Sequence, residues 1–229
     1  MTWSEAGIDS AYRAAVREGW PLLIPALPFA LVLGVAISDG TFGVLVGWST
    51  SWIVFAGAAQ LALVTLFVEV GPVSAIVSAL VVNARHLMYS AALAPAFRQQ
   101  PPWFRYLAPY VLIDQIFAVT ITKLDADPTY FRRYYVMLGS VFWVSWQVTV
   151  GAGVLLGNGV PAEWGLGFAV PVLFIGLTVL SVVRRPALMA AAVGFVVAVV
   201  AAPLPNRSGL LVGAIAGVVA GAAIDRDPV

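Results

Sequence analysis

Long uncharged stretches divide the chain into eight hydrophobic segments that are separated by short polar loops. A bilayer core about 30 Å thick requires roughly 20 apolar residues for one helical crossing, and only the fourth and eighth segments are clearly short for that task. The pattern predicts an all-α, polytopic integral membrane protein with six to eight hydrophobic segments, some of them discontinuous or re-entrant, in a single transmembrane domain over residues 1–229. The segments are 19–38, 40–68, 70–97, 106–122, 134–157, 164–183, 186–203 and 208–224.

The first segment carries three prolines, Pro21, Pro25 and Pro28, within its uncharged run. A secretory signal has an apolar core of about 7–15 residues and a cleavage site of small residues, and this segment has neither. We therefore expect a retained membrane helix whose backbone the prolines break or loosen. Residues 9–18 have the pattern of a short amphipathic helix, so residues 1–18 are expected to lie in the cytoplasm or at the membrane interface.

Basic residues in the loops set the expected orientation, because cytoplasmic loops carry an excess of Lys and Arg. If all eight segments cross the bilayer, Arg98 and Arg105 fall in an outer loop. If the second and fourth segments are instead re-entrant hairpins, these two arginines join most other loop cations on the inner side, which fits the rule better. Both arrangements place the N- and C-termini in the cytoplasm. The other loop cations are Arg13, Arg17, Lys123, Arg132, Arg133, Arg184, Arg185, Arg207 and Arg226.

Composition narrows the class of protein further. The chain is 61% hydrophobic and 10% charged, with a mean hydropathy of +0.95, whereas soluble domains are about 45–50% apolar and about 25% charged. A net charge of +1 and the lack of a basic block argue against nucleic-acid binding. The chain has no cysteine, which excludes disulfides, thiolate metal sites and thiol nucleophiles. Metalloprotease, phosphate-loop, dinucleotide and nucleophile-elbow motifs are also missing, so we expect neither an enzyme nor a metal or cofactor.

Three ionisable residues, Arg85, His86 and Asp114, lie deep inside predicted membrane segments. Such groups cost roughly 2.5–3.5 kcal/mol each on insertion scales, so they mark candidate functional positions. Asn83 and His86 share one helical face, which makes a polar sector near the middle of the membrane. If the third segment consists of two shorter elements, we expect the break at residues 83–86, where freed backbone groups need a cavity or protein partners.

Asp114 lies in the middle of the short fourth segment, where a carboxyl group must be protonated or paired with a cation. In a functional role it would bind a substrate ammonium group or carry a proton. In a structural role it would form a buried ion pair with Arg85, and the two roles are compatible in different states of a cycle. Alternatively, Arg85 snorkels to an interface and has no such partner.

Small residues form two further patterns. Residues 56–59 are all small, which admits a ligand or another helix backbone. If the second segment is two half-helices, Gly57, Ala58 and the amide of Gln60 are candidate substrate-binding residues, because the N-terminus of a half-helix suits a carboxylate; the alternative is a helix-packing face. In the last segment glycines recur every four residues, which predicts a contact face for another helix or subunit. These glycines are Gly209, Gly213, Gly217 and Gly221.

These patterns resemble the AzlC family of branched-chain amino-acid permeases, which form the large subunit of a bacterial exporter. The resemblance covers about residues 20–120, where the matching stretches occur in the family's order and at similar spacing. They are the proline-rich first segment through Leu33-Gly34, then Phe55-Ala56-Gly57-Ala58-Ala59-Gln60, then Asn83-Ala84-Arg85-His86-Leu87-Met88-Tyr89, and the Asp114 segment ending in Ile116-Phe117-Ala118. The chain departs from the family at Gln115, where members often have an acidic residue, and this change bears on proton coupling and on the substrate.

The resemblance implies a transporter domain in the bacterial plasma membrane that exports leucine, valine and isoleucine, with methionine as a further candidate, together with a small hydrophobic AzlD-type subunit. A zwitterion needs a site for each of its charges and an apolar pocket. Arg85, with the backbone of residues 56–59, fits the carboxylate, Asp114 fits the ammonium group, and His86 is the candidate proton relay together with Asp114. Two alternatives stay open: a channel or structural membrane subunit without its own transport cycle, and an intramembrane enzyme, which would lack a paired nucleophile.

Overall fold

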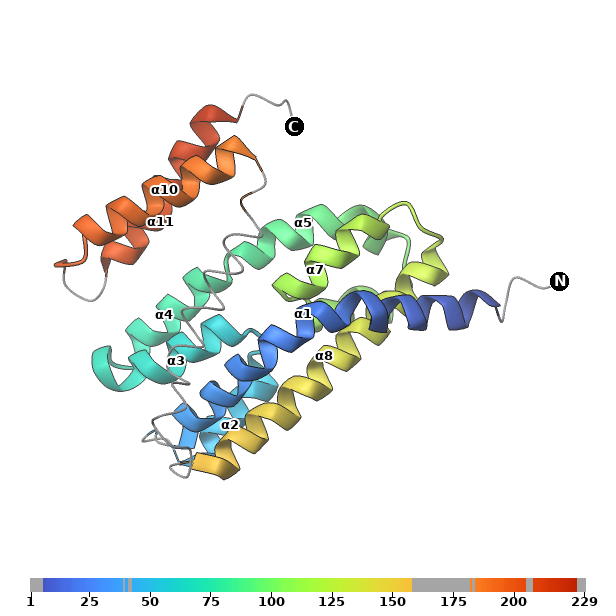
Figure 1. Cartoon of the computed structure of the whole chain (residues 1–229), viewed down its shortest axis with the longest axis horizontal. Coiled ribbons are helices and arrows are strands. Elements are labelled where there is room, and N and C mark those ends of the chain that lie inside the picture. Colours follow the sequence, from blue (N-terminus) through green and yellow to red (C-terminus); the bar gives the residue numbers. More distant parts are fainter. Residues whose placement is uncertain are drawn as a thin grey trace. The chain divides into compact units, whose positions relative to one another are not determined.

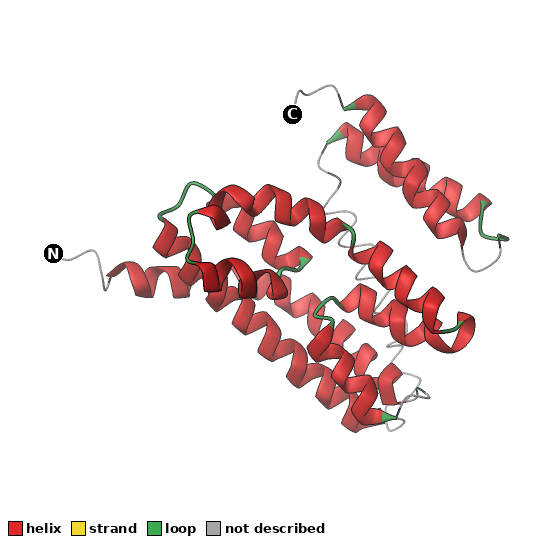
Figure 2. Cartoon of the chain, turned by 180° about the vertical axis from the view of Figure 1, so that it is seen from behind, coloured by secondary structure: helices red, strands yellow, loops and turns green. Residues whose placement is uncertain are grey.

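The computed structural model describes residues 6–38, 40, 43–157, 182, 184–204 and 208–225. This part of the chain contains helices, turns and loops and no strand (Figure 2), which confirms the all-α prediction. Contacts group the chain into two compact units, Met1–Ala169 and Val170–Val229. A single domain over the whole chain stays a prediction, and the segment predicted over residues 164–183 lies outside the described residues.

The described helices follow the predicted hydrophobic segments closely but divide several of them (Figure 1). In the first unit they are α1 (Ala6–Ser38), α2 (Val44–Ile53), α3 (Gly57–Val70), α4 (Pro72–Asn83), α5 (Arg85–Arg98), α6 (Pro102–Leu107), η1 (Ala108–Val111), α7 (Asp114–Thr120), η2 (Ile121–Lys123) and α8 (Pro128–Leu156). In the second unit they are α10 (Arg185–Val200) and α11 (Ser208–Ile224).

Helix α1 is continuous through all three of its prolines, so the expectation of a broken backbone is wrong. Pro21, Pro25 and Pro28 recur at helical spacing and all three are exposed, whereas the opposite face of the helix is buried. The bonds that proline cannot make are therefore lost on the face away from the core, and the packed face holds the helix together. The amphipathic segment predicted over residues 9–18 is the first part of the same helix.

Helices α1 and α8 pack in parallel against each other (Figure 1). Towards their N-terminal ends, Tyr134 Oη donates to Glu18 Oε2 over 2.8 Å. Towards their C-terminal ends, Gly34 lies against Gly153, and a Cβ added to either glycine would overlap a backbone carbonyl oxygen of the other helix. The absence of side chains at this contact lets the two backbones touch, and the pair forms the framework of the first unit.

Local sequence explains where several elements begin and turn. Helix α8 begins after Asp127, whose Oδ1 accepts hydrogen bonds from the backbone N–H groups of Thr129 and Tyr130 at 2.9 and 3.1 Å. Pro128 occupies the first helical position, where its missing N–H costs nothing. Between α3 and α4 the chain reverses at Gly71, whose φ of +84° is a backbone conformation that glycine adopts readily.

Helices α4 and α5 follow each other with only Ala84 between them, and together they form an apolar segment of 27 residues. The segment runs antiparallel to α1 and α8 (Figure 1). Its C-terminal end lies beside the start of α8, since Gln100 Nε2 donates to the carbonyl oxygen of Pro128 over 3.0 Å. Among the described residues, three stretches are helical, long and apolar enough to cross a membrane: Ser10–Ser38, Pro72–Arg98 and Pro128–Leu156.

Helices α2 and α3 form a hairpin between α1 and this long segment. Helix α2 starts beside the C-terminal part of α1, where Gly47 lies against Ile37. The chain then reverses across residues 54–56, which brings α3 back beside α2. Gln60 Nε2 in α3 accordingly donates to Thr50 Oγ1 in α2 over 2.8 Å. The turn from α3 into α4 lies at the end of the unit where α1 finishes (Figure 1), so this hairpin returns to the side from which it came.

The stretch from α6 to η2 forms a second hairpin that starts and returns at the opposite end of the unit. Gln100, just before it, lies beside the start of α8, and Lys123 at its finish lies 3.1 Å from Glu18 of α1. In between, Tyr110 Oη donates to the carbonyl oxygen of Trp52 over 2.6 Å, which places η1 beside the end of α2. Each of the two hairpins thus starts and returns at one end of the first unit, which is the chain path expected if the second and fourth hydrophobic segments are re-entrant.

The second unit is a hairpin of α10 and α11 whose contact is built from glycine and alanine. Gly209, Gly213, Gly217 and Gly221 are all buried, and a Cβ at each would lie within about 3 Å of α10 or the turn that follows it. Gly213 and Gly217, for example, lie against the backbone of Gly194. The glycine face predicted from sequence thus packs against the neighbouring helix of the same chain.

Candidate functional site

Arg85 and Asp114, the opposite charges predicted inside membrane segments, form an ion pair. Arg85 Nη1 lies 2.8 Å from Asp114 Oδ2, and the two side chains are 30% and 20% exposed. Each residue is the first of a helix that follows a break in helical structure. Arg85 follows the turn at Ala84, and Asp114 follows the extended residue Ile113. A carboxylate in the first turn of a helix is stabilised by the backbone dipoles, and here it also neutralises a guanidinium at the start of α5.

Each partner in this ion pair keeps one buried polar atom that has no hydrogen-bond partner among the described residues. These atoms are Arg85 Nε and Asp114 Oδ1, and Oδ1 of Asn83 is a third. A buried polar group without a partner costs about 1–3 kcal/mol, so a ligand that pairs with these atoms recovers that free energy. The set consists of one donor and two acceptors beside a bound pair of opposite charges.

A cavity of about 270 Å³ lies where the three interruptions of the helices meet. It is lined by residues of the break between α2 and α3, of the break between α4 and α5, and of the extended stretch before α7. Non-helical backbone inside a membrane is tolerated where it lines such a cavity. The ion pair does not itself line this cavity, but Asn83 and His86, on either side of Arg85, do. The lining residues are Ile53, Val54, Phe55, Ala56, Asn83, His86, Ser90, Pro109, Tyr110 and Leu112.

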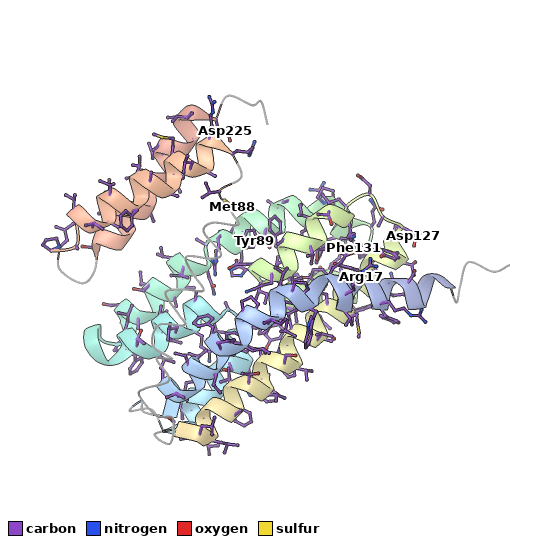
Figure 3. The ribbon with its side chains drawn as sticks, in the orientation of Figure 1. Arg17, Met88, Tyr89, Asp127, Phe131 and Asp225 are labelled. Atoms are coloured by element: carbon purple, nitrogen blue, oxygen red, sulfur yellow. The ribbon has the colours of Figure 1, made fainter. Side chains whose placement is uncertain are left out.

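His86 projects into the cavity with one ring nitrogen already engaged. Its Nδ1 lies 3.0 Å from the carbonyl oxygen of Asn83. Because a carbonyl oxygen only accepts, Nδ1 carries the hydrogen and Nε2 is left as the acceptor. The ring also meets Tyr89, which is labelled on α5 in Figure 3, edge to face at 5.6 Å. Tyr89 in turn stacks on Phe117 of α7 at 4.2 Å between centroids. This stacking holds α5 to α7 beside the ion pair.

The small-residue run before Gln60 is used for packing. Gly57 faces Trp146 and Phe29, whose rings a Cβ at this position would overlap. Ala56 lines the cavity, while Ala59 is fully buried in a cluster with Ala79 of α4. Neither Gly57, where α3 begins, nor Ala58 lines the cavity. Of the predicted substrate-binding set, the structure pairs Arg85 with Asp114, places Asn83 in the cavity wall, and leaves Gly57 and Ala58 outside. The packing alternative describes most of this run.

Gln60 belongs to a separate polar cluster. It is fully buried, and its Nε2 donates to the hydroxyl oxygens of Thr50 and Ser51 at 2.8 and 2.6 Å. Gln147 of α8 joins the cluster by donating from Nε2 to the carbonyl oxygen of Ser51 over 2.9 Å. Sequence reasoning missed this cluster, although a lone amide such as Gln147 within an apolar segment was a usable signal. The cluster joins α2 to α3 and α8 next to residues 54–56, the break between α2 and α3 that lines the cavity.

A second ion pair lies away from the cavity, near the start of α8. Lys123 Nζ lies 3.1 Å from Glu18 Oε2, and Tyr134 Oη donates to the same oxygen over 2.8 Å. Lys123 also lies over the ring of Tyr134, 5.6 Å from its centroid. Lys123 ends η2, Tyr134 lies in the second turn of α8 and Glu18 belongs to α1, so this pair fastens the second hairpin to α1 and α8. Among the described residues, no group of three His, Asp or Glu side chains is arranged to hold a metal ion.

The amino-acid sequence matches a protein-family model and is similar to several known proteins. A family model described as AzlC protein matches residues 21–160, a stretch that includes Arg85 and Asp114. The inner membrane protein YgaZ of Escherichia coli (strain K12) is 28% identical over 226 residues, which cover 93% of this chain and 89% of that protein. The branched-chain amino acid transport protein AzlC of Bacillus subtilis (strain 168) is 28% identical over 173 residues, covering 71% of this chain and 66% of that protein.

A further relative is archaeal. An uncharacterized membrane protein of Archaeoglobus fulgidus is 27% identical over 150 residues, which cover 66% of this chain. The match spans 64% of the archaeal protein, less than two thirds of its length. No solved structure matches the chain.

Proposed function

The chain belongs to the AzlC family of membrane proteins, and from that premise we propose that it is a secondary transporter that exports branched-chain amino acids across the bacterial plasma membrane. Its relative in Bacillus subtilis is named as a branched-chain amino acid transport protein. In this proposal the substrate is bound by Arg85, Asn83 and Asp114, next to the cavity at the three helix interruptions. Both termini face the cytoplasm, which places the end of the first unit that carries Arg98 and Arg105 on the cytoplasmic side.

The observation that carries the proposal is the set of unpaired buried atoms around the ion pair. Arg85 Nε can donate to a carboxylate oxygen, and Asp114 Oδ1 and Asn83 Oδ1 can accept from an ammonium group. An α-amino acid presents both groups on one carbon. Its insertion exchanges one ion pair for two, so charge stays balanced while the buried atoms gain partners. Because these atoms are closed off, binding requires α5 and α7 to separate at the ion pair.

The apolar part of the cavity supports the choice of side chain. Ile53, Val54, Phe55 and Leu112 line it, and each buried CH₂ group of a ligand contributes about 0.8 kcal/mol. Leucine, isoleucine and valine fill such a space with branched carbon, and methionine does so with a flexible chain. Alanine and glycine would leave most of the apolar wall without contacts, so they are expected to be poor substrates.

We further propose that His86 and Asp114 couple export to protons. His86 Nε2 is free to take a proton from the cavity, and histidine changes charge at about pH 6.5 when unperturbed. Asp114 is the second group proposed to carry a proton, in a state of the cycle without bound substrate. The proposed partners are the amino-acid substrate, the surrounding lipid and a small hydrophobic AzlD-type subunit. No nucleic acid, metal or cofactor takes part.

The test is counterflow of leucine, valine, isoleucine and methionine in proteoliposomes, with and without a pH gradient. We expect Arg85→Gln and Asp114→Asn to abolish counterflow, and His86→Gln to keep counterflow but to lose its response to the gradient. Glu18→Gln is the matched control, because it breaks an ion pair that lies away from the cavity. Normal counterflow by Arg85→Gln, at normal membrane insertion, would instead favour a structural subunit or channel whose ion pair only joins helices.

A further inference from the structure

A second cavity, of about 180 Å³, adjoins the first on the side of the C-terminal end of α5. The two cavities share three lining residues, Ser90, Pro109 and Leu112. The shared residues belong to α5 and to the stretch around η1, so one wall continues from one cavity into the other. The second cavity is therefore placed between the ion-pair region and the helix end at Arg98.

One face of α5 forms this continuous wall. His86 and Ser90 line the first cavity, and Ser90, Ala94 and Arg98 line the second. These positions are four residues apart, so they follow one another along a single stripe of the helix. Twelve residues of α-helix span about 18 Å. The stripe thus leads from near the middle of the first unit to its end.

Two arginines, Arg98 and Arg105, line the outer part of the second cavity. Both are exposed, and neither guanidinium has an ion-pair or hydrogen-bond partner among the described residues. Two other cations near this end are engaged, since Lys123 pairs with Glu18 and Arg132 Nη1 donates to Gln100 Oε1 over 3.2 Å. The two cavity arginines therefore present unneutralised positive charge at the mouth of the path.

Apart from Ser90, the rest of the second cavity is apolar. Leu93, Phe97 and Leu112 contribute carbon surface, and no carboxylate lines the cavity. Two guanidinium groups beside an apolar wall suit a molecule with one carboxylate and an aliphatic side chain. These cationic groups provide no acceptor for an ammonium group. In a cleft with low-dielectric walls, charge of one sign raises the local concentration of oppositely charged ligand.

We propose that Arg98 and Arg105 form an entrance site that captures the carboxylate of the substrate before it moves along α5 to the Arg85–Asp114 pair. The proposal rests on the proposed function, because it takes the transported amino acid as the ligand. The entrance site selects for carboxylate and aliphatic side chain, whereas the inner site selects for the complete zwitterion. The same anionic chemistry is offered by a lipid phosphate, which is the other possible source of the ligand.

The test measures leucine counterflow kinetics for Arg98→Gln/Arg105→Gln in proteoliposomes. We expect KM to rise about tenfold, in line with the about 10–10³-fold effects of electrostatic steering, with Vmax unchanged. The KM of the unaltered protein rises with ionic strength, and that of the variant does not. Arg98→Lys/Arg105→Lys keeps both charges and restores a low KM. Arg133→Gln is the control, because this arginine lies near the same end and lines neither cavity.

Further measurements distinguish a substrate carboxylate from a lipid phosphate as the bound anion, and the proposed entrance site from the proposed transport function. Leucinamide, which lacks the carboxylate that both sites require, should leave leucine counterflow unchanged in both proteins. A KM change that appears only in vesicles with phosphatidylglycerol, and not in neutral phosphatidylcholine vesicles, would assign the arginines to lipid and overturn the entrance site. An unchanged KM would overturn it as well, while leaving the inner site standing. If the unaltered protein moved no leucine at all, the proposed function would fall and the entrance site with it.

Discussion

Replacing the Arg85–Asp114 pair one charge at a time and then together separates its structural role from its role in transport. Arg85→Gln or Asp114→Asn alone leaves the opposite charge without its partner at 2.8 Å. Breaking a buried ion pair from one side costs about 3–5 kcal/mol. Because these side chains keep 30% and 20% exposure, water offsets part of the loss, and we expect about 2–3 kcal/mol for each single change.

The double variant should recover most of that stability. It replaces two charges by two amides that can bond to each other, and such neutral replacements of buried pairs are often close to neutral in free energy. Thermal unfolding of the detergent-solubilised protein should then show a drop in Tm of about 4–12 °C for each single variant, at about 2–4 °C per kcal/mol for a chain of this size. The double variant should melt close to the unaltered protein, which corresponds to a coupling energy of about 4–6 kcal/mol, the sum of the two single losses.

Leucine counterflow supplies the second readout of the same three proteins. All three should be inactive, because amides cannot exchange partners with the charges of a zwitterion. A double variant that regains both its Tm and its counterflow would refute the assignment of the pair to substrate binding. A double variant whose loss of stability equals the sum of the two single losses would show that the two charges are not coupled, which would refute the energetic argument itself.

Two other predictions concern the framework and the topology. Gly153→Ala should destabilise the protein by about 1–3 kcal/mol in thermal unfolding, because its Cβ overlaps the backbone of α1, whereas Gly151→Ala on the same helix meets only an aromatic ring at 3.7 Å and should be tolerated; equal Tm values for the two would count against the close contact. The chain has no cysteine, so cysteines placed singly at Arg98, Val73 and Tyr12 can be labelled with a membrane-impermeant reagent. Arg98 should react from the same side as Tyr12 and Val73 from the opposite side, and the reverse pattern would indicate eight full crossings.

The sequence offered the charged pair as one of its alternatives and marked the position where the third segment is interrupted, whereas the break that it suggested in the first segment is not found. Charged groups inside a membrane segment are costly enough that Arg85 and Asp114 had to be paired or functional, and the polar sector around Asn83 marked the interruption of the third segment. The all-α class followed from hydrophobic length alone. The repeat of glycines in the last segment placed a packing face correctly along α11, although the sequence does not name the neighbour that it contacts.

Other features depend on tertiary packing and leave little local signal. Gln60 turns away from the cavity because Thr50 and Ser51 are brought beside it by the reversal of the chain at residues 54–56. The prolines of α1 suggested a broken helix, yet they all fall on its exposed face. Tyr110, which lines the cavity and bonds to the end of α2, reads in sequence as an ordinary aromatic residue near the membrane interface. In each case the deciding contact is with a residue far away in the chain.

The short helix α7 gives the two charges of the pair unequal freedom to move. Arg85 belongs to a segment of 27 residues that runs the length of the first unit. Asp114 is carried by a helix of seven residues, set between the extended stretch at 112–113 and the short turn η2. Rotations about a few backbone bonds therefore suffice to swing the carboxylate aside, whereas shifting the guanidinium by its backbone means displacing a full span. Asp114 is therefore the partner that can swing away by a local change of backbone conformation, and Arg85 is the partner whose backbone stays in place.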